Sequence, residues 1–254
     1  MKPDERSRLI ARLVGVACTL AAFALVEALI RLDLINRFVV PLPSQILAAI
    51  PRIVTEENVL RRFWQTTEEV IWAAAMLVVV GVSVGALLNR FRLLRLATET
   101  WVAALAAVPI VLMYPLFLVI FGRSATTIVM IGFTAGLAPV ILKTMEGLSA
   151  TRKVLLDVGR SFRVSPSQQF WKILLPAALP TVFDGLRLGL IFAMINIVGV
   201  EYLINFGGLG QLINELAERY DLPGTYGAIL FVVLVSILFF DLAGRVERWL
   251  RPAS

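Results

Sequence analysis

The chain of 254 residues contains no histidine and a single cysteine, Cys18. Metal sites built on imidazole and acid–base catalysis by histidine are therefore excluded. A lone cysteine cannot form an internal disulfide, and we interpret Cys18, which lies in an apolar run, as a small packing residue. The sequence also has no Gly-x-Ser-x-Gly, no Gly-x-x-x-x-Gly-Lys-Ser/Thr and no cysteine cluster, so it shows no means of hydrolysing ATP itself.

Charged residues are scarce as well. They make up 17% of the chain, against about 25% in soluble domains, while 59% of the residues are hydrophobic and the mean hydropathy is +0.84. The apolar runs are continuous and do not alternate, which favours membrane-spanning helices over a membrane β-barrel. The net charge of +6 is then a sign of membrane topology, not of nucleic-acid binding.

Six apolar runs approach the roughly 20 residues that a helix needs to cross a bilayer. The first follows a charged N-terminal segment and is longer than the core of a signal peptide, so we expect it to be retained as a span. The predicted spans are Leu9–Ile30, Glu69–Leu88, Trp101–Phe121, Thr126–Leu142, Thr181–Leu203 and Tyr226–Ala243.

Basic residues give the orientation, because loops on the cytoplasmic side carry an excess of lysine and arginine. With the N-terminus inside, 17 of the 24 basic residues are cytoplasmic and 7 are external. We therefore predict an all-α polytopic membrane protein with six transmembrane helices and both termini in the cytoplasm. It forms a single domain over residues 1–254, with its core at 60–250.

A polar interval from Leu155 to Leu190 separates the fourth and fifth spans. Apolar residues recur on one side of its first part at helical spacing, from Val154 to Phe162, and polar residues take the other side. The pattern predicts a short amphipathic helix, a turn at residues 165–167, and a second short helix that ends near Pro176, with Pro176 and Pro180 fixing where it stops. This cytoplasmic loop covers residues 152–180.

Two prolines interrupt the third span, at Pro109 and Pro115. Prolines in a membrane helix kink it and free backbone carbonyl groups, which is tolerated beside packed neighbours or a water-filled path. A packing kink and a place on a translocation path both remain open here.

The external stretches are also patterned. Residues 31–68 contain a turn at Leu42-Pro43-Ser44 and then two amphipathic helices, Gln45–Val54 and Val59–Gln65, which are expected at the membrane interface. A glycine-rich turn, Gly207 to Gly210, follows the fifth span; because it lies on the external side, we interpret it as a tight turn and not as a nucleotide cradle.

Taken together, these motifs resemble bacterial ABC-importer permeases, the binding-protein-dependent inner-membrane component, in their sulfonate/nitrate/taurine-like branch. The resemblance rests on the Ile173–Pro176 ending of the polar loop, the Leu42-Pro43-Ser44 turn, the "VP…YPLF…FG" pattern of the third span and the Gly208–Gly210 turn. The loop departs from the family at its beginning. Its acidic position falls on Asp157, followed by Val158 and Gly159 where the family has two alanines, and the family's glycine position falls on Arg163.

The resemblance implies a non-enzymatic permease in the bacterial inner membrane that forms the path for a small solute, such as a sulfonate, nitrate, taurine, another organic anion or a vitamin precursor. It implies cytoplasmic ABC ATPase partners, a second identical or paralogous permease, and an extracytoplasmic solute-binding protein. The chain itself is expected to bind no cofactor or metal, with ATP and Mg held by the ATPase. The departure at Arg163 suggests pairing with a different permease.

The resemblance also implies which residues act. Those expected to couple to the ATPase are Asp157, Gly159, Arg160, Ser161, Arg163, Ser165, Pro166 and Pro176. The resemblance places Pro109, Met113 and Pro115 at the translocation path or gate. Asn196, Gly199 and Glu201 are also expected there, from their positions in the middle and outer part of the fifth span.

Each residue also has a plainer interpretation. Asp157 suits a helix N-terminus, and Arg160 and Arg163 suit lipid headgroups. Asn196 suits an interhelical hydrogen bond, and the carboxylates of Glu27 and Glu201 suit a position where they reach the membrane interface. The alternative function is an ion-driven transporter or channel that works without an ATPase.

Overall fold

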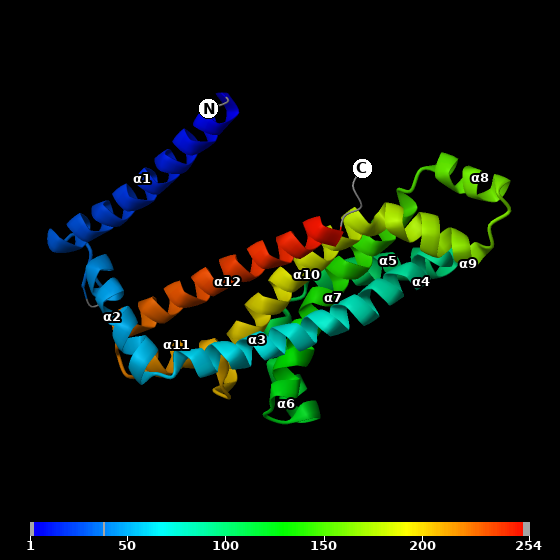
Figure 1. Ribbon diagram of the computed structural model, residues 1–254. Helices are drawn as coiled ribbons and strands as arrows, with labels where there is room; N and C mark the ends of the chain where they lie inside the picture. Colours follow the sequence, from blue (N-terminus) through cyan, green and yellow to red (C-terminus); the bar gives the residue numbers. More distant parts are fainter. Residues whose placement is uncertain (1–2, 38, 251–254) are drawn as a thin grey trace. The chain divides into compact units, whose positions relative to one another are not determined.

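The computed structural model of the protein describes residues 3–37 and 39–250, and every regular element in that part of the chain is helical (Figure 1). The helices are α1 (Pro3–Arg31), α2 (Pro43–Glu56), α3 (Val59–Met76), α4 (Val82–Arg90), α5 (Arg92–Ala107), α6 (Tyr114–Phe121), α7 (Ala125–Ser149), α8 (Lys153–Ser161), α9 (Pro166–Gln169), α10 (Leu175–Ile204), α11 (Gly208–Glu218) and α12 (Leu222–Leu250). Shorter turns of helix are η1 (Leu77–Gly81), η2 (Ile110–Met113) and η3 (Phe170–Leu174).

The chain forms two compact units. One consists of the described residues up to Leu60 together with Leu212–Phe231. The other consists of Arg61–Gln211 and the described residues from Val232 onwards.

Among the described residues, five helical runs are long and apolar enough to cross a membrane, and a bent pair of helices makes a sixth candidate span. The five runs are Leu13–Arg31, Val59–Arg90, Ala125–Ser149, Pro166–Ile204 and Leu222–Arg245. They fall on the predicted spans, so the helical membrane architecture is confirmed. The separate interfacial helix expected at Val59–Gln65 is wrong, because these residues are the first turns of α3, which runs on through η1 into α4.

The third predicted span is broken, not merely kinked. Arg92–Ala107 and Ile110–Phe121 meet at an angle of 87°, and Figure 1 shows α6 turning away from α5. Proline has no N–H and forces the residue before it into an extended conformation. Val108 accordingly has a ψ of 126°, and α5 ends at Ala107.

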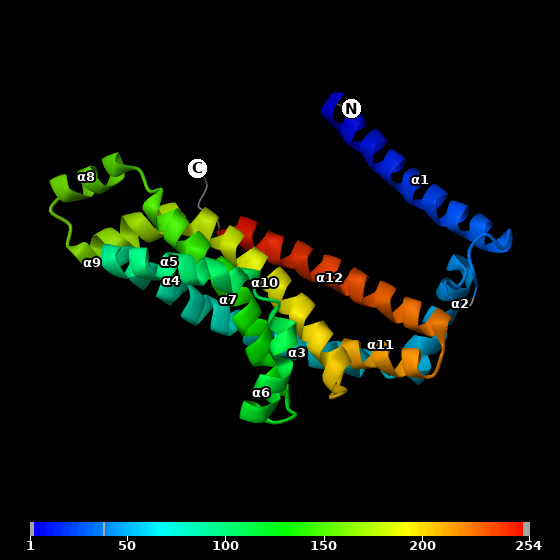
Figure 2. The same ribbon diagram turned by 180° about the vertical axis from the view of Figure 1, so that it is seen from behind.

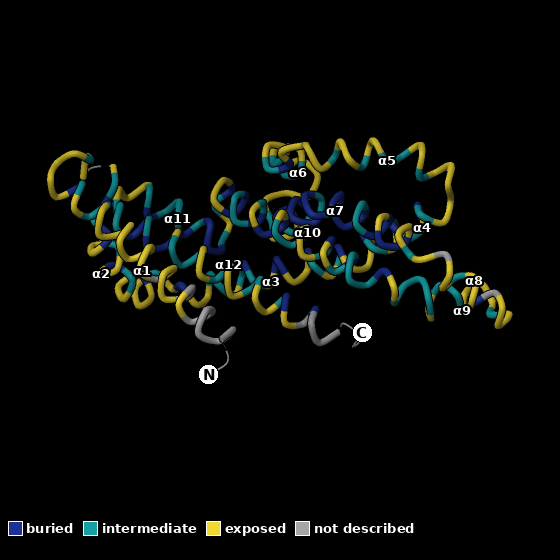
Figure 3. The backbone as a smooth tube through the Cα atoms, turned by 90° about the horizontal axis from the view of Figure 1, so that it is seen from above, coloured by how far each residue is buried: buried dark blue, intermediate teal, exposed yellow. Residues whose placement is uncertain are grey.

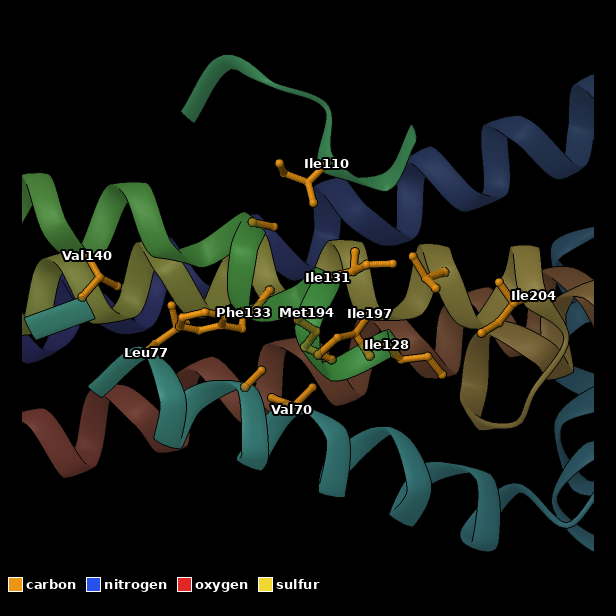
Figure 4. Packing of buried hydrophobic residues seen from close by; sticks show 14 residues of the cluster. Val70, Leu77, Ile110, Ile128, Ile131, Phe133, Val140, Met194, Ile197 and Ile204 are labelled. Carbon is orange, nitrogen blue, oxygen red and sulfur yellow. The ribbon is translucent and has the colours of Figure 1, made fainter. Parts of the chain in front are cut away.

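Helices α7 and α10 form the centre of the larger unit and lie side by side in Figures 1 and 2. Much of α7 is buried, as the dark segments of Figure 3 show. Their buried apolar residues, among them Ile131, Met194 and Ile197, form one cluster with Val70 and Leu77 from α3 and η1 (Figure 4).

Within the smaller unit, α2 is attached at both of its ends. The Ser44 hydroxyl and amide donate to the Glu27 carboxylate of α1 at 3.0 and 3.2 Å. On the other side, Arg52 forms an ion pair with Asp221, which raises the pKa of Arg52 through their hydrogen bond and charge attraction. Apolar burial adds to these contacts, because Ile53 packs in a cluster with Leu212 and Leu216.

Candidate functional site

Helix α8 occupies the first half of the polar loop, where the sequence predicts a short helix. The turn predicted at residues 165–167 is wrong, because the chain turns at residues 162–163 and α9 already begins at Pro166. Arg163 has a φ of 53°, and the Val164 amide donates to the Gly159 carbonyl at 3.3 Å. Helices commonly end with such a hydrogen bond, and the residue just after the last turn then adopts a left-handed backbone conformation. That residue is normally glycine. Arg163, at the position where the resembled family has glycine, thus adopts a left-handed backbone conformation.

Helix α9 begins with a capping box. Ser165 Oγ accepts from the Gln168 amide at 3.3 Å, and Gln168 Oε1 accepts from the Ser165 amide at 3.0 Å. Pro166 occupies the first turn, where its missing N–H costs nothing. Gln169 Nε2 donates to the Leu156 carbonyl at 3.1 Å and so joins α9 to α8.

The predicted end of this second helix near Pro176 is wrong. Helix continues from Pro166 through η3 into α10 and on to Ile204. The reason is that η3 is a π turn, whose longer hydrogen bonds shift the bonding pattern just before Pro176, a residue that cannot donate. Pro180 lies inside α10 and does not end it either.

The apolar side of α8 that the sequence indicated faces outward. Val154, Val158 and Phe162 are 69%, 48% and 79% exposed. The side that packs inward contains Gly159, which is buried and where a β-carbon would stand 2.6 Å from Ile173 Cδ1. On the polar side, Asp157, Ser161 and Arg163 are exposed. The side chain of Arg160 lies outside the described residues.

The residues expected along the path lie where α10 meets the break in the third span. Pro109 precedes η2, Met113 is the last residue of η2, and Pro115 lies in the first turn of α6; all three are exposed. A β-carbon on Gly199 would lie 3.5 Å from Val111 of η2, so Gly199 is the contact point between α10 and this break. Asn196 Nδ2 donates to the Phe192 carbonyl at 2.8 Å, one turn earlier in its own helix, and not across to another helix.

The expectation that the Glu201 carboxylate reaches the membrane interface is wrong, because the Glu201 side chain is fully buried. Its carboxylate accepts from Thr66 Oγ1 at 2.6 Å and from the Gly210 amide at 2.7 Å, so it caps the first turn of α11. Thr66 Oγ1 in turn accepts from the Leu209 amide at 2.9 Å. A β-carbon on Gly208 would overlap the Glu201 carboxylate, which explains the glycines of the turn.

Sequence reasoning missed a second buried carboxyl group. Glu69 of α3 is 7% exposed and contacts Glu201, and its Oε2 has no hydrogen-bond partner among the described residues. It lines a cleft of about 450 Å³ whose polar and aromatic walls are Gln65, Glu68, Glu69, Trp72, Thr126 and Phe206. The sequence signal was the pair Glu68-Glu69 at the N-terminal end of an apolar run.

No group of three or more histidine, cysteine, aspartate or glutamate side chains is placed to hold a metal ion in the described part of the chain. The features that do stand out are an exposed, capped helix pair between α7 and α10 and a broken span beside α10. Residues 77–252 match the family of binding-protein-dependent transport system inner membrane components. The chain belongs to this family.

Known relatives agree with the branch that the motifs indicate. The chain is 25% identical over 94% of its length to a probable ABC transporter permease of Brucella melitensis, of which it covers 97%. It is 24% identical over 87% to the taurine transport system permease TauC of Escherichia coli, covering 82% of that protein. It is 25% identical over 74% to the bicarbonate transport system permease CmpB of Synechococcus elongatus, covering 69%.

A solved structure shares the fold. A chain of the inward-facing MetNI methionine ABC transporter superposes with a TM-score of 0.66 at 20% identity, over 75% of this chain and 94% of that one. This ABC permease is therefore an all-helical membrane protein with a known architecture.

Proposed function

We propose that this chain is the permease subunit of an ABC importer in the bacterial inner membrane, which forms a solute path together with a second permease. The observation that carries this proposal is the exposed apolar side of α8. Val154, Val158 and Phe162 are turned outward although α8 lies outside every candidate span. Exposed apolar groups of this kind, gathered next to charged residues, mark a docking surface. A cytoplasmic ATPase is the partner that it fits.

The connections of α8 suggest how ATP hydrolysis drives the path. Gln169 joins α8 to α9, and helix continues without a break from α9 through η3 into α10. A push on α8 is thus transmitted along α10, as in rigid-body switching between two states. The broken third span contacts α10 at Gly199, so movement of α10 changes the region around Pro109.

This function implies which side of the membrane each loop faces. Both termini and the loop at residues 152–180 lie in the cytoplasm, as the excess of basic residues there indicates. Residues 31–68 and the turn after α10 face outward, where a solute-binding protein docks. ATP and Mg are held by the ATPase, and this chain supplies no catalytic group.

The transported solute is small. Relatives named for taurine and bicarbonate transport support a small anion or a zwitterion, delivered by the binding protein. The left-handed arginine at Arg163 supports a further proposal, that the second permease is a paralogue whose loop holds glycine at this position.

The test is purification of the tagged chain from its host in mild detergent, followed by mass spectrometry. We expect an ABC ATPase at matching stoichiometry, with a second permease beside it. Uptake that collapses with an uncoupler while no ATPase co-purifies would instead establish an ion-driven transporter. An active homodimer with its ATPase would remove the paralogue from the proposal.

A further inference from the structure

The cleft between α3 and α7 contains a carboxyl group that nothing in the transport scheme uses. Glu69 is buried at its inner wall, and Glu69 Oε2 has no hydrogen-bond partner among the described residues. A buried polar oxygen without a partner is costly, so such a group is a candidate for binding a ligand. We propose that this cleft binds the ammonium group of a small organic solute, with the Glu69 carboxylate as its counter-ion and the Trp72 ring as its aromatic wall.

The first argument is electrostatic. Glu201 already accepts from Thr66 Oγ1 and the Gly210 amide, and both hydrogen bonds favour its charged form. Glu69 contacts this carboxylate, and the other charged group that acts on Glu69 is Glu68. Carboxylates in contact repel each other, so the pair is stable only with one proton or one cation beside it. The Glu69 side chain lines the cleft, and its carboxyl group is where a cation adds a hydrogen bond.

The second argument is the shape of the cleft. Gln65, Glu69, Trp72 and Met76 follow one another at spacings of three and four residues, so they share one face of α3. Trp72 is 60% exposed, and its ring borders the same cleft as Glu69. An aromatic face next to a carboxylate is the arrangement that binds ammonium ions.

Two other occupants fit less well. A bare metal ion needs several converging ligands, and the described residues form no such group. An anion needs basic side chains, whereas no lysine or arginine is among the lining residues, which the structure describes in full. The cleft thus accepts an amine or the ammonium end of a zwitterion and disfavours a simple anion.

This inference deepens the proposed function, on which it rests only for placing the cleft on the outer side. The test uses the full chain without an ATPase, so a failure to purify an ATPase leaves its result intact. The chain is reconstituted into phosphatidylcholine nanodiscs and titrated calorimetrically with n-butylammonium and, separately, with butanesulfonate. We expect saturable binding of the ammonium probe at one site and none of the sulfonate.

Variants locate the site. Glu69→Gln removes the counter-ion and should weaken binding of n-butylammonium by about tenfold or more. Trp72→Leu should weaken it about two- to thirtyfold, the range of a cation–π contact. Trp64→Leu and Glu56→Gln are matched controls, because both residues are exposed and lie outside the cleft, and these variants should bind as the parent does.

Four results would overturn the proposal. They are no saturable binding by the parent chain, equal binding of butanesulfonate, unchanged binding by Glu69→Gln, and an equal loss in the Trp64→Leu control. If Glu69→Gln fails to fold, Trp72→Leu alone decides, because an exposed side chain can be changed without disturbing the core.

Discussion

Gly136 of α7 lies directly against Gly189 of α10. A β-carbon on Gly136 would stand 2.5 Å from the Gly189 carbonyl oxygen, and one on Gly189 would stand 2.8 Å from the Gly136 carbonyl oxygen. Small residues at such a crossing let two membrane helices approach closely and gain dispersion contacts. The central helix pair of this permease therefore depends on the absence of two side chains.

The first prediction concerns this crossing. Gly136→Ala places a methyl group against rigid backbone, so we expect a loss of about 1–3 kcal/mol of stability, as for other overpacked cores. Unfolding of the purified chain in mixed micelles by increasing SDS measures it. Gly199→Ala is the control, because its β-carbon would meet Val111 at an ordinary 3.5 Å. Equal stability of the two variants would contradict the close crossing.

The second prediction concerns the buried cap of α11. Glu201→Ala leaves the Gly210 amide and the Thr66 hydroxyl without their acceptor, so we expect a loss of about 2–4 kcal/mol. Thr66→Val removes part of the same network. Because the two residues share a hydrogen bond, the double variant should lose less than the sum of the single losses.

The control for this cycle is Thr67→Val. The Thr67 hydroxyl donates to the Phe63 carbonyl of its own helix at 2.7 Å, so the effect of Thr67→Val should be additive with that of Glu201→Ala. Additivity of Thr66→Val as well would show that the network does not form in solution.

The third prediction concerns Asp221, which has two roles. Its Oδ1 accepts from the Gly224 amide at 3.1 Å at the start of α12, and its other oxygen pairs with Arg52. Asp221→Asn keeps the acceptor and loses the charge, so we expect a cost well below 1 kcal/mol, as for exposed ion pairs. Asp221→Ala also loses the cap and should cost about 1 kcal/mol more. Amide exchange in the first turn of α12 separates the two variants.

The sign of the pH dependence follows from Arg52. Asp221 raises the pKa of Arg52 in the folded state. A group whose pKa is raised on folding stabilises the fold fully at a pH below its unfolded-state pKa. This stabilisation is lost as the pH rises through the folded-state pKa. For arginine that loss falls in strong alkali, so the Arg52 contribution should stay constant from pH 6 to 9, measured by the same exchange experiment.

The membrane spans were predictable because each is a local pattern. Long apolar runs locate five spans and the bent helix pair, and Pro109 marks where the third run breaks, although the sequence indicated no more than a kink. The end of the second loop helix was not predictable, because a π turn at Phe170–Leu174 lets the helix pass Pro176, and no propensity signals it. Local patterns also misjudged Glu201, since burial depends on partners far away in sequence.

The candidate site shows the same division. The capping sequence from Ser165 to Gln168 and the left-handed position at Arg163 follow from local rules or from the family resemblance. The contact between Glu69 and Glu201 joins two helices that are distant along the chain. A single sequence contains no signal for that pairing, and only the folded arrangement of α3 and α10 reveals it.

The fourth prediction concerns the left-handed turn. Arginine at a φ of 53° carries a steric penalty that glycine lacks, so Arg163→Gly should stabilise the turn by about 1 kcal/mol. Arg163→Ala keeps the β-carbon and is the matched control for loss of the charge. Limited proteolysis between α8 and α9 reports the difference. Faster cleavage of Arg163→Gly than of Arg163→Ala would mean that the turn adopts another conformation in solution.

The fifth prediction concerns coupling. Deleting Ser161–Ser167 removes both the turn at Arg163 and the capping box at Ser165, so α8 can no longer transmit force to α10. Replacing Asp157, which is exposed on α8, removes a charge that we propose contacts the ATPase and keeps the helix. Both changes should abolish transport-linked stimulation of ATPase activity in proteoliposomes.

Membrane insertion should persist, because the α7–α10 crossing lies outside the deleted segment. Thr98→Ala is the control: Thr98 is far from the loop in sequence, and its hydroxyl donates to the Leu94 carbonyl of its own helix. Normal stimulation in the deletion variant would show that force reaches α10 by another route.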